Sequence, residues 1–357
     1  MAREQILAVL ATDRVPLTGQ SWVAADAVEG IEFDHGRAQI TLSLGYPARS
    51  QHAAMGEHLR AQIKAQTGIE AQIQFNTRIA SHAVQKNLKP LAQIKNIIAV
   101  ASGKGGVGKS TVAANLALAL RLEGARVGML DADIYGPSQP RMLGSSERPT
   151  SPDGKRMNPI IAHGIQTMSI GFLVDDDQPM IWRGPMVVQA LNQLLLETQW
   201  QDLDYLIVDL PPGTGDIQLS LSQRIPVSGA IIVTTPQDIA LLDARKGLQM
   251  FRRVEVPVLG VVENMAWHVC GNCGHQEAIF GSGGGERLSS QYGTELLGQL
   301  PLDLRIREQA DSGNPTVAAD PDGELAARYR QIARNATAQL AYHSAAQAFP
   351  EIQISDD

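Results

Sequence analysis

The sequence has few of the residues that secreted or membrane-spanning proteins need. It contains two cysteines in 357 residues, too few for a disulfide framework. It has no apolar run near the roughly 20 residues that a membrane-spanning helix requires. Its first residues, Met-Ala-Arg-Glu-Gln, lack the basic-then-apolar order of a signal peptide. We therefore expect a cytoplasmic protein with no membrane partner.

A surplus of positive charge is also missing. The 30 Lys and Arg residues are outnumbered by 37 Asp and Glu residues, which gives a formal net charge of -7. Proteins that coat DNA or anionic membranes need a basic face to neutralise phosphates, so we expect no nucleic acid partner. The length and the 44% hydrophobic content allow a full core and favour two domains.

The first 80 residues predict a small α/β domain. Apolar and polar residues alternate over residues 38–44 and again over 69–75, as in half-buried strands. Between these strands Met55, Leu59 and Ile63 recur every fourth residue, which predicts a helix. Residues 81–95 are polar and basic with little periodicity, so they are interpreted as a linker.

Residues 96–357 predict a larger domain with a doubly wound, mostly parallel sheet. Short apolar runs of the buried-strand type alternate there with helical patterns. Ligands of such sheets bind at the carboxyl ends of the strands. The glycine-rich residues 281–285 are interpreted as a turn that leads into a helix. The predicted strands cover residues 97–101, 126–130, 165–170, 205–208, 230–234 and 258–262.

A phosphate loop follows the first of these strands. It has the pattern Gly-x-x-x-x-Gly-Lys-Ser and leads into a predicted helix over residues 110–123. Glycines let consecutive amides turn toward phosphates, Lys109 would reach the β and γ oxygens, and the Ser110 hydroxyl would ligate Mg²⁺. The predicted nucleotide-binding residues of the loop are Gly103, Lys104, Gly105, Gly106, Val107, Gly108, Lys109, Ser110 and Thr111.

The loop carries a second lysine, Lys104, directly after its first glycine. With Lys-Gly-Gly-Val-Gly-Lys-Ser-Thr over residues 104–111, the chain resembles the deviant P-loop ATPases, which include MinD, ParA, the nitrogenase iron protein and the Mrp/ApbC iron-sulfur carriers. The resemblance implies that Lys104 reaches across a homodimer interface to the partner's nucleotide. Such a cation would stabilise the transferring phosphoryl group only in a closed dimer. The alternative is a solvated lysine at the edge of the loop.

Two further strand ends carry aspartates beside this loop. Asp131 is expected in the magnesium shell, and the resemblance implies that Asp133 orients the attacking water. Asp209 would hold a magnesium-bound water, and the Gly213 amide would sense the γ-phosphate. Lys104, Lys109 and Asp133 are therefore the predicted catalytic residues of an ATPase.

Asn264 lies two residues beyond the predicted strand 258–262. It aligns with the asparagine that the resembled families use to bind the purine edge. An amide suits adenine, and the chain has no Asn-Lys-x-Asp stretch of the guanine-specific type, so ATP is the expected nucleotide. Asn264 could alternatively serve as a turn former at the end of the strand.

The two cysteines, Cys270 and Cys273, follow in the next loop. Thiols with two residues between them can bind one metal together. A [4Fe-4S] cluster takes four cysteine ligands, so a symmetric homodimer with two from each chain would complete it. Zinc could bridge the dimer in its place. Two alternatives stay open, a redox dithiol and a zinc site within one chain made by His268, Cys270, Cys273 and His275.

Together these motifs resemble the Mrp/ApbC iron-sulfur carriers over residues 95–345. The N-terminal domain is similar to one that many bacterial members carry, which usually reads Pro-Ala-Cys-Pro. Here residues 47–50 read Pro-Ala-Arg-Ser, so we expect this domain to dock other proteins. The resemblance implies a homodimer that binds a labile [4Fe-4S] cluster under the control of MgATP. Its implied partners are iron-sulfur scaffold proteins and recipient apoproteins.

Two other functions remain possible at this point. One is a MinD- or ParA-like positioning ATPase, which would need a basic amphipathic C-terminal helix or a DNA-binding face. The chain ends instead in Phe-Pro-Glu-Ile-Gln-Ile-Ser-Asp-Asp. The other is an ATPase that zinc staples into a scaffold for protein assembly.

Overall fold

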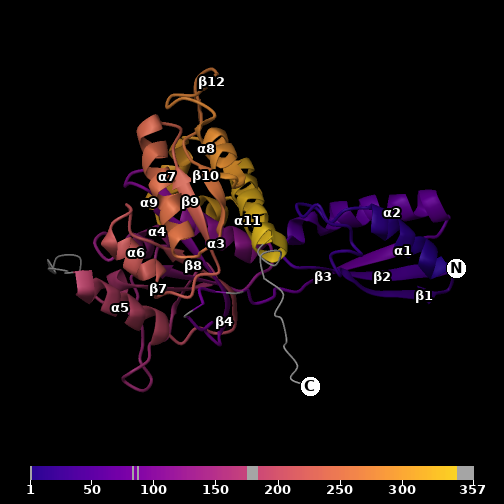
Figure 1. Ribbon diagram of the computed structural model, residues 1–357, viewed down its shortest axis with the longest axis horizontal. Helices are drawn as coiled ribbons and strands as arrows, with labels where there is room; N and C mark the ends of the chain where they lie inside the picture. The colour runs from indigo at the N-terminus through magenta and orange to yellow at the C-terminus, as the bar shows by residue number, and fades with distance from the viewer. Residues whose placement is uncertain (1, 83, 87, 175–183, 344–357) are drawn as a thin grey trace, which may run out of the picture. The chain divides into compact units, whose positions relative to one another are not determined.

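The protein consists of two compact units (Figure 1). A computed structural model describes residues 2–82, 84–86, 88–174 and 184–343. One unit comprises Met1–His82 together with Thr337–Asp357, and the other comprises Ala83–Ala336.

The small unit is built around a three-stranded sheet in the order β1-β2-β3. Strands β1 (Val28–Asp34) and β2 (Arg37–Leu44) form an antiparallel hairpin. Helix α2 (His52–Thr67) then returns the chain to β3 (Ala71–Thr77), which runs parallel to β2. Helix α1 (Ala2–Thr12) precedes the sheet.

The strand and helix predictions for this unit are confirmed. The alternating residues of β2 and the fourth-residue stripe of α2 are buried in one hydrophobic cluster. Helix α1 and strand β1 were not predicted. In β1, Ile31 is the one buried residue, so the strand lacks the alternation of a half-buried strand. Arg49, in the family's cysteine position, is exposed in the 3₁₀ turn η1 (Arg49–Gln51).

The last described helix, α11 (Glu324–His343), supplies its C-terminal part to the small unit. Ala338 is fully buried in the core of that unit. The Tyr342 hydroxyl accepts a hydrogen bond from the Gly45 amide at 3.0 Å. The predicted domain of residues 96–357 is therefore wrong at its C-terminal end, where the chain belongs to the small unit. The sequence of α11 has one continuous helical pattern, so it does not indicate that the second part of the helix packs against a different unit.

The large unit contains an eight-stranded sheet in the order β13-β10-β9-β4-β8-β5-β7-β6. Every pairing in it is parallel except that of β6 with β7. All six predicted strands are present, and the doubly wound fold is confirmed. The two edge strands were not predicted. The strands are β4 (Ile94–Ala101), β5 (Val127–Asp131), β6 (Ile160–Ala162), β7 (Ile165–Ser169), β8 (Leu203–Asp209), β9 (Gly229–Thr234), β10 (Val258–Glu263) and β13 (Leu296–Gln299).

Helices cover both faces of this sheet. The connections from β4 to β5 and from β8 to β9 run in opposite directions, so right-handed crossovers place their helices on opposite faces. The predicted helix after the phosphate loop is α3, and the glycine-rich turn leads into α8 as predicted. The helices are α3 (Lys109–Leu122), α4 (Gln139–Met142), α5 (Gly184–Leu196), α6 (Asp216–Ser222), α7 (Asp238–Arg253), α8 (Gly284–Tyr292), α9 (Leu304–Asp311) and α10 (Thr316–Ala319), with the 3₁₀ turn η2 (Ile170–Phe172).

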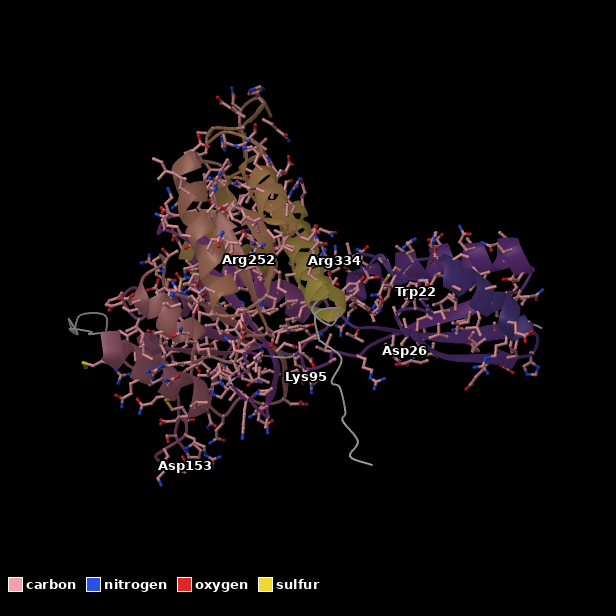
Figure 2. All side chains as sticks on the ribbon, viewed as in Figure 1. Trp22, Asp26, Lys95, Asp153, Arg252 and Arg334 are labelled. Carbon is pink, nitrogen blue, oxygen red and sulfur yellow. The ribbon has the colours of Figure 1, made fainter. Side chains whose placement is uncertain are left out.

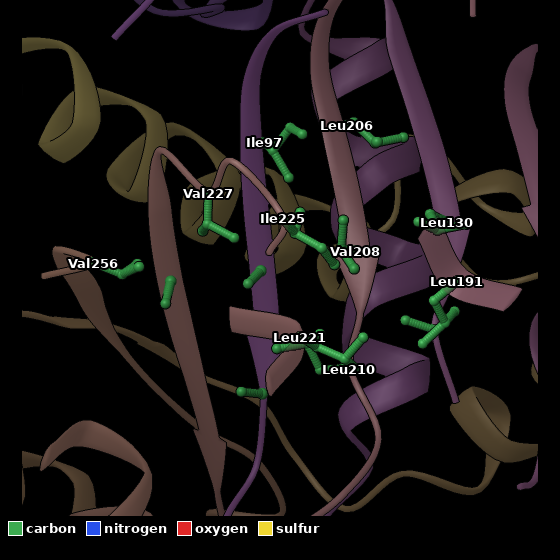
Figure 3. Close-up of a cluster of buried hydrophobic side chains, with 14 of the residues drawn as sticks. Ile97, Leu130, Leu191, Leu206, Val208, Leu210, Leu221, Ile225, Val227 and Val256 are labelled. Carbon is green, nitrogen blue, oxygen red and sulfur yellow. The ribbon is translucent and has the colours of Figure 1, made fainter. Parts of the chain in front are cut away.

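The core of the large unit surrounds β8, in which every residue is buried. Leu206 and Val208 of this strand belong to the same hydrophobic cluster as Ile97 and Leu130 (Figure 3). Both faces of the strand are covered, which explains the continuous apolar run over residues 205–208 between Asp204 and Asp209. This packing fixes the carboxyl ends of β4, β5 and β8 beside one another.

At the opposite ends of these strands, Asp204 joins three of them. Its carboxylate accepts hydrogen bonds from Lys95 Nζ at 2.9 Å and from the Arg126 backbone amide at 2.9 Å (Lys95 is labelled in Figure 2). Burial by itself would raise the pKa of Asp204, but hydrogen bonds from Arg126 and Lys95 outweigh it and hold the pKa below its ordinary value.

The segment predicted as a linker, residues 81–95, is partly packed against the large unit. The Gln85 amide donates to the carbonyl oxygens of Ser222 at 2.7 Å and Ile225 at 3.3 Å. Strand β4 begins within the segment, at Ile94. In the part of the chain that the structure describes, no helix has the length and apolar character needed to cross a membrane.

Candidate functional site

The phosphate loop connects β4 to α3, and its glycines are required by their surroundings. A Cβ atom on Gly103 would lie 2.2 Å from the backbone carbonyl carbon of Asp243 on α7. Gly106 and Gly108 have left-handed backbones with φ of 82° and 81°. A Cβ on Gly108 would lie 2.3 Å from the side-chain nitrogen of Asn264. Larger residues at Gly103 and Gly108 would displace the loop from α7 and from the end of β10.

Lys109 and Asp209 form a buried ion pair at the start of α3. The Lys109 ammonium donates to Asp209 Oδ1 and, at 3.1 Å, to Ser110 Oγ. The side chains are 6% and 0% exposed. The structure thus brings together the residues predicted for the phosphates, Lys109, and for the magnesium ion, Ser110 and Asp209. Removing one partner of an ion pair this deeply buried strongly destabilises the folded protein, because the other charge stays buried without a counter-charge.

Gln139 also belongs to this cluster, and the sequence analysis missed it. Its side-chain amide donates to Asp209 Oδ2 at 2.9 Å and to the Ser110 carbonyl oxygen at 3.1 Å. The residue is 1% exposed. It lies one position beyond the segment 131–138, and this adjacency was the one signal that the sequence offered.

Asp131 organises the segment that follows β5. Its Oδ1 accepts a hydrogen bond from the Asp133 amide at 3.1 Å. Its Oδ2 accepts from the amides of Ser138 and Gln139, both at 3.1 Å, and from the Ser169 hydroxyl at 3.0 Å. Burial and the nearby Asp209 carboxylate raise the pKa of Asp131 to about 7, against the effect of these donors. Both oxygens hold the loop in shape, a role the sequence did not indicate.

Asp133 is half-buried close to the same charges. Burial raises the pKa of its carboxyl, Asp209 adds to the rise, and Lys109 opposes it. The amides of Gly136 and Tyr135 hydrogen-bond to Asp133 and favour its ionised form. Asp209 pairs with Lys109, and the carboxyl groups of Asp131 and Asp133 both lie close enough to Asp209 to interact with its charge. One buried lysine thus faces more than one acidic group, an arrangement in which a further cation is electrostatically favoured.

Gly213, predicted to sense the γ-phosphate, donates its amide to the Ser102 carbonyl oxygen at 3.0 Å. The Ser102 hydroxyl donates to the Lys104 carbonyl oxygen at 2.9 Å. The segment after β8 is thus tied to the first residues of the phosphate loop. Lys104 is half-exposed, and its ammonium forms no hydrogen bond or ion pair with the residues that the structure describes.

Asn264 ties the end of β10 to the phosphate loop. Its side-chain nitrogen donates to the Val107 carbonyl oxygen at 2.9 Å, and its backbone amide donates to the Thr234 carbonyl oxygen at 2.8 Å. The residue is 8% exposed. Asn264 therefore does more than form a turn, because its side chain links the end of β10 with the phosphate loop.

Cys270 and Cys273 lie on a hairpin beyond β10. The hairpin joins the short strands β11 (His268–Val269) and β12 (Gln276–Glu277), and β12 lies at the outer tip of the large unit (Figure 1). The amides of Asn272 and Cys273 hydrogen-bond to the Cys270 sulfur, and the Cys273 thiol does so as well. These donors lower the pKa of the Cys270 thiol. Cys270 is half-buried and Cys273 is exposed, so both sulfurs are side by side and accessible.

Comparison with protein families decides the assignment of the large unit. The model of the NUBPL iron-transfer P-loop NTPase family matches residues 93–337, and the model of iron-sulfur cluster assembly proteins matches residues 3–74. The chain belongs to the NUBPL iron-transfer P-loop NTPase family. The family predicted from the phosphate loop, the aspartate segments and the cysteine pair is confirmed.

Individual relatives agree with this family assignment. The iron-sulfur cluster carrier protein of Escherichia coli K12 is 52% identical over 340 residues, which cover 95% of this chain and 92% of that protein. The carrier protein of Pseudomonas fragi is 63% identical over 265 residues, which cover 74% of this chain and 92% of that protein. A solved nucleotide-binding protein from Archaeoglobus fulgidus, in complex with ADP, matches with a TM-score of 0.55 and 37% identity, covering 62% of this chain and 87% of its own.

The single-chain zinc site considered from the sequence is not formed by the four residues His268, Cys270, Cys273 and His275. Among the residues that the structure describes, no three His, Cys, Asp or Glu side chains gather as a metal-binding group. His268 Nδ1 lies 3.0 Å from the Leu302 carbonyl oxygen, to which it has to donate because a carbonyl only accepts. His268 thus anchors the hairpin, and the two thiols form an incomplete site within one chain.

Proposed function

We propose that the protein is an ATP-dependent iron-sulfur cluster carrier. A homodimer would bind one labile [4Fe-4S] cluster as cargo through Cys270 and Cys273 of each chain, and MgATP binding or hydrolysis would control loading or delivery. The observation that carries the proposal is the pair of adjacent, accessible thiols on the β11–β12 hairpin. Two thiols per chain leave a four-ligand cluster half coordinated, so a second copy supplies the rest.

The ATP site would work through exchanges of partner at Lys109 and Asp209. The ATP phosphates would replace Asp209 as the partner of Lys109, leaving Asp209 and the Ser110 hydroxyl as oxygen ligands for Mg²⁺ or its waters, a donor set that this cation prefers. Mg²⁺ would supply neutralisation of charge on the β and γ oxygens. Asp133 would orient the attacking water, and Asp131 would hold the segment that carries Asp133.

Lys104 would add control by the dimer. Its ammonium has no partner among the described residues, so it is available to a second chain. In a closed homodimer it would approach the partner's nucleotide and stabilise the transferring phosphoryl group. Gly213 would sense the γ-phosphate only after its amide leaves the Ser102 carbonyl, which makes that hydrogen bond part of the switch.

Asn264 supports coupling between nucleotide and cargo. Its hydrogen bond to Val107 joins the phosphate loop to the chain segment that reaches Cys270 six residues later. Rearrangement of the loop around ATP would therefore act on the base of the hairpin. Asn264 would also contribute to adenine recognition through the free hydrogen-bonding capacity of its amide. Opening of the dimer would release half the cluster ligands at once, which suits transfer to recipient apoproteins.

The test is anaerobic reconstitution with iron and sulfide, followed by metal analysis and absorption spectroscopy. Wild-type protein should bind about four irons per two chains, as a four-iron cluster with four thiolates requires. Cys270→Ala and Cys273→Ala should each remain colourless, whereas Ser282→Ala in the neighbouring loop should load normally. An unaltered cluster in Cys270→Ala would contradict the proposal.

The same preparations separate the alternatives. Stoichiometric zinc in protein purified without air, with no cluster after reconstitution, would favour an assembly scaffold stapled by zinc. ATP-dependent sedimentation with anionic liposomes, or retention on DNA at ordinary salt, would favour a MinD- or ParA-like positioning ATPase.

A further inference from the structure

Gln139 has an unpaired oxygen inside the cluster of predicted magnesium ligands. Its side chain lies between Ser110 and Asp209, to which its amide nitrogen donates at 3.1 and 2.9 Å. Both contacted atoms are acceptor oxygens, so the nitrogen of the amide and not its oxygen makes these two hydrogen bonds. That oxygen, Gln139 Oε1, is buried and has no hydrogen-bond partner among the described residues.

A buried acceptor without a partner is destabilising, because it has lost its hydrogen bonds to water. Gln85 shows that an unpaired oxygen is not by itself a ligand site. Its side-chain nitrogen also donates to two carbonyl oxygens, and its Oε1 also has no hydrogen-bond partner in the described part of the chain. Gln139 differs in its neighbours. Its nitrogen donates to a carboxylate oxygen of Asp209 and to the backbone carbonyl oxygen of Ser110, the two residues that the proposed function gives to Mg²⁺. Mg²⁺ keeps several waters that need acceptors around them.

We propose that Gln139 is a positioning residue for magnesium, whose Oε1 accepts a hydrogen bond from a water in the Mg²⁺ shell while its nitrogen holds Asp209 in place. The inference rests on the proposed MgATP site. It also gives the metal a connection to the segment after β5, since the Gln139 backbone amide donates to Asp131 Oδ2 and Asp131 Oδ1 holds the Asp133 amide. Binding of magnesium would then affect the position of Asp133, the proposed water-orienting carboxylate.

Gln139→Met tests this proposal because methionine keeps the length of the side chain and removes both polar atoms. The measurement is ADP binding by calorimetry, in EDTA and across a Mg²⁺ titration. Loss of a residue that supports metal ligands typically lowers metal affinity 10–100-fold. We expect the Mg²⁺ concentration at half-maximal effect to rise about tenfold, with ADP affinity in EDTA unchanged within about twofold.

Gln139→Glu provides a second variant with a different expected pattern. It keeps an acceptor for the magnesium shell but places a negative charge near the phosphates. ADP binding in EDTA should weaken, while the Mg²⁺ concentration at half-maximal effect should stay at or below the wild-type value. If Gln139 has only a structural role, the glutamate variant should instead bind ADP more weakly than wild type both in EDTA and in Mg²⁺. Gln85→Met is the matched control and should leave the magnesium dependence unchanged.

Three results are decisive. An unchanged magnesium dependence in a folded Gln139→Met protein would overturn the inference and leave the ATP site intact. Equal losses with and without Mg²⁺ in both Gln139 variants would overturn it in favour of a structural role. Absence of ADP and ATP binding in wild-type protein would overturn the proposed function and this inference together.

Discussion

At the scale of single residues, Lys109 has two roles: it stabilises the fold through its ion pair with Asp209, and it is the proposed partner of the nucleotide phosphates. Lys109→Ala leaves the fully buried Asp209 carboxylate without its cation. We expect loss of nucleotide binding and a fall in the free energy of unfolding by about 3–5 kcal/mol. The double variant Lys109→Ala/Asp209→Asn should regain part of that stability, because the amide removes the unpaired charge. Urea unfolding of the single and double variants measures these free energies. If the effects of Lys109→Ala and Asp209→Asn simply add, the buried ion pair is not the source of the stability.

Lys104 should behave differently, because its ammonium has no partner in its own chain among the described residues. We expect Lys104→Ala to bind MgATP with affinity within about twofold of wild type and to lose ATP hydrolysis by about 100-fold or more. Lys155→Ala, a change at an exposed lysine in a loop, is the control for lost charge. Normal hydrolysis by the Lys104 variant would show that the lysine does not act across a dimer interface.

The sequence predicted the residue types of the site better than their contacts. Spacing alone identified Lys109, Ser110, Asp131 and Asp209, because a phosphate loop and neighbouring strand ends constrain where such residues can lie. It could not show that Lys109 pairs with Asp209. It also missed Gln139, since a glutamine beside a motif has no chemistry of its own until its neighbours are known.

At the scale of elements, Asp204 ties together the amino ends of three strands. Its pKa is lowered in the folded protein, so its ionised form stabilises the fold at pH values above the unfolded pKa of about 3.9. This stabilisation is lost as the pH falls through the lower folded-state pKa. Asp204→Asn should therefore cost about 1–2 kcal/mol at pH 7, allowing for partly exposed partners, and progressively less toward pH 3.

Asp202→Asn is the matched control for this change. Asp202 also pairs with Arg126 but is 71% exposed, so we expect an effect on the free energy of unfolding within about 0.5 kcal/mol. Denaturant unfolding from pH 7 to pH 3 measures both variants. A constant difference between wild type and Asp204→Asn across this range would show that the ionised carboxylate is not the source of the stability.

The central strands could be predicted from sequence and the edges could not. Strands such as β8 are buried on both faces and leave a continuous apolar run. Strands β6 and β13 have three and four residues, and each pairs on one side only, so too few residues carry the pattern. Strand β1 of the small unit could not be predicted for the same reason, because one of its seven residues is buried.

At the scale of the whole molecule, the C-terminal part of α11 completes the small unit. Ala338 is fully buried in that core, and Ala327 on the same helix is exposed. Ala338→Asp buries a charge and should destabilise the small unit by several kcal/mol, while the large unit still binds nucleotide. Ala327→Asp should change stability by about 0.5 kcal/mol or less. Hydrogen exchange resolved by segment, with ADP binding in parallel, measures the effect, and uniform loss in both units would contradict it.

The central claim is that two copies of this chain share one cluster. Native mass spectrometry of protein reconstituted without oxygen tests it most directly, because it weighs the assembly with its cargo. We expect a species of two chains carrying one [4Fe-4S] cluster, and we expect this species to be absent when Cys270 and Cys273 are replaced. A cluster carried by a single chain, or a dimer that never acquires iron and sulfide, would contradict it.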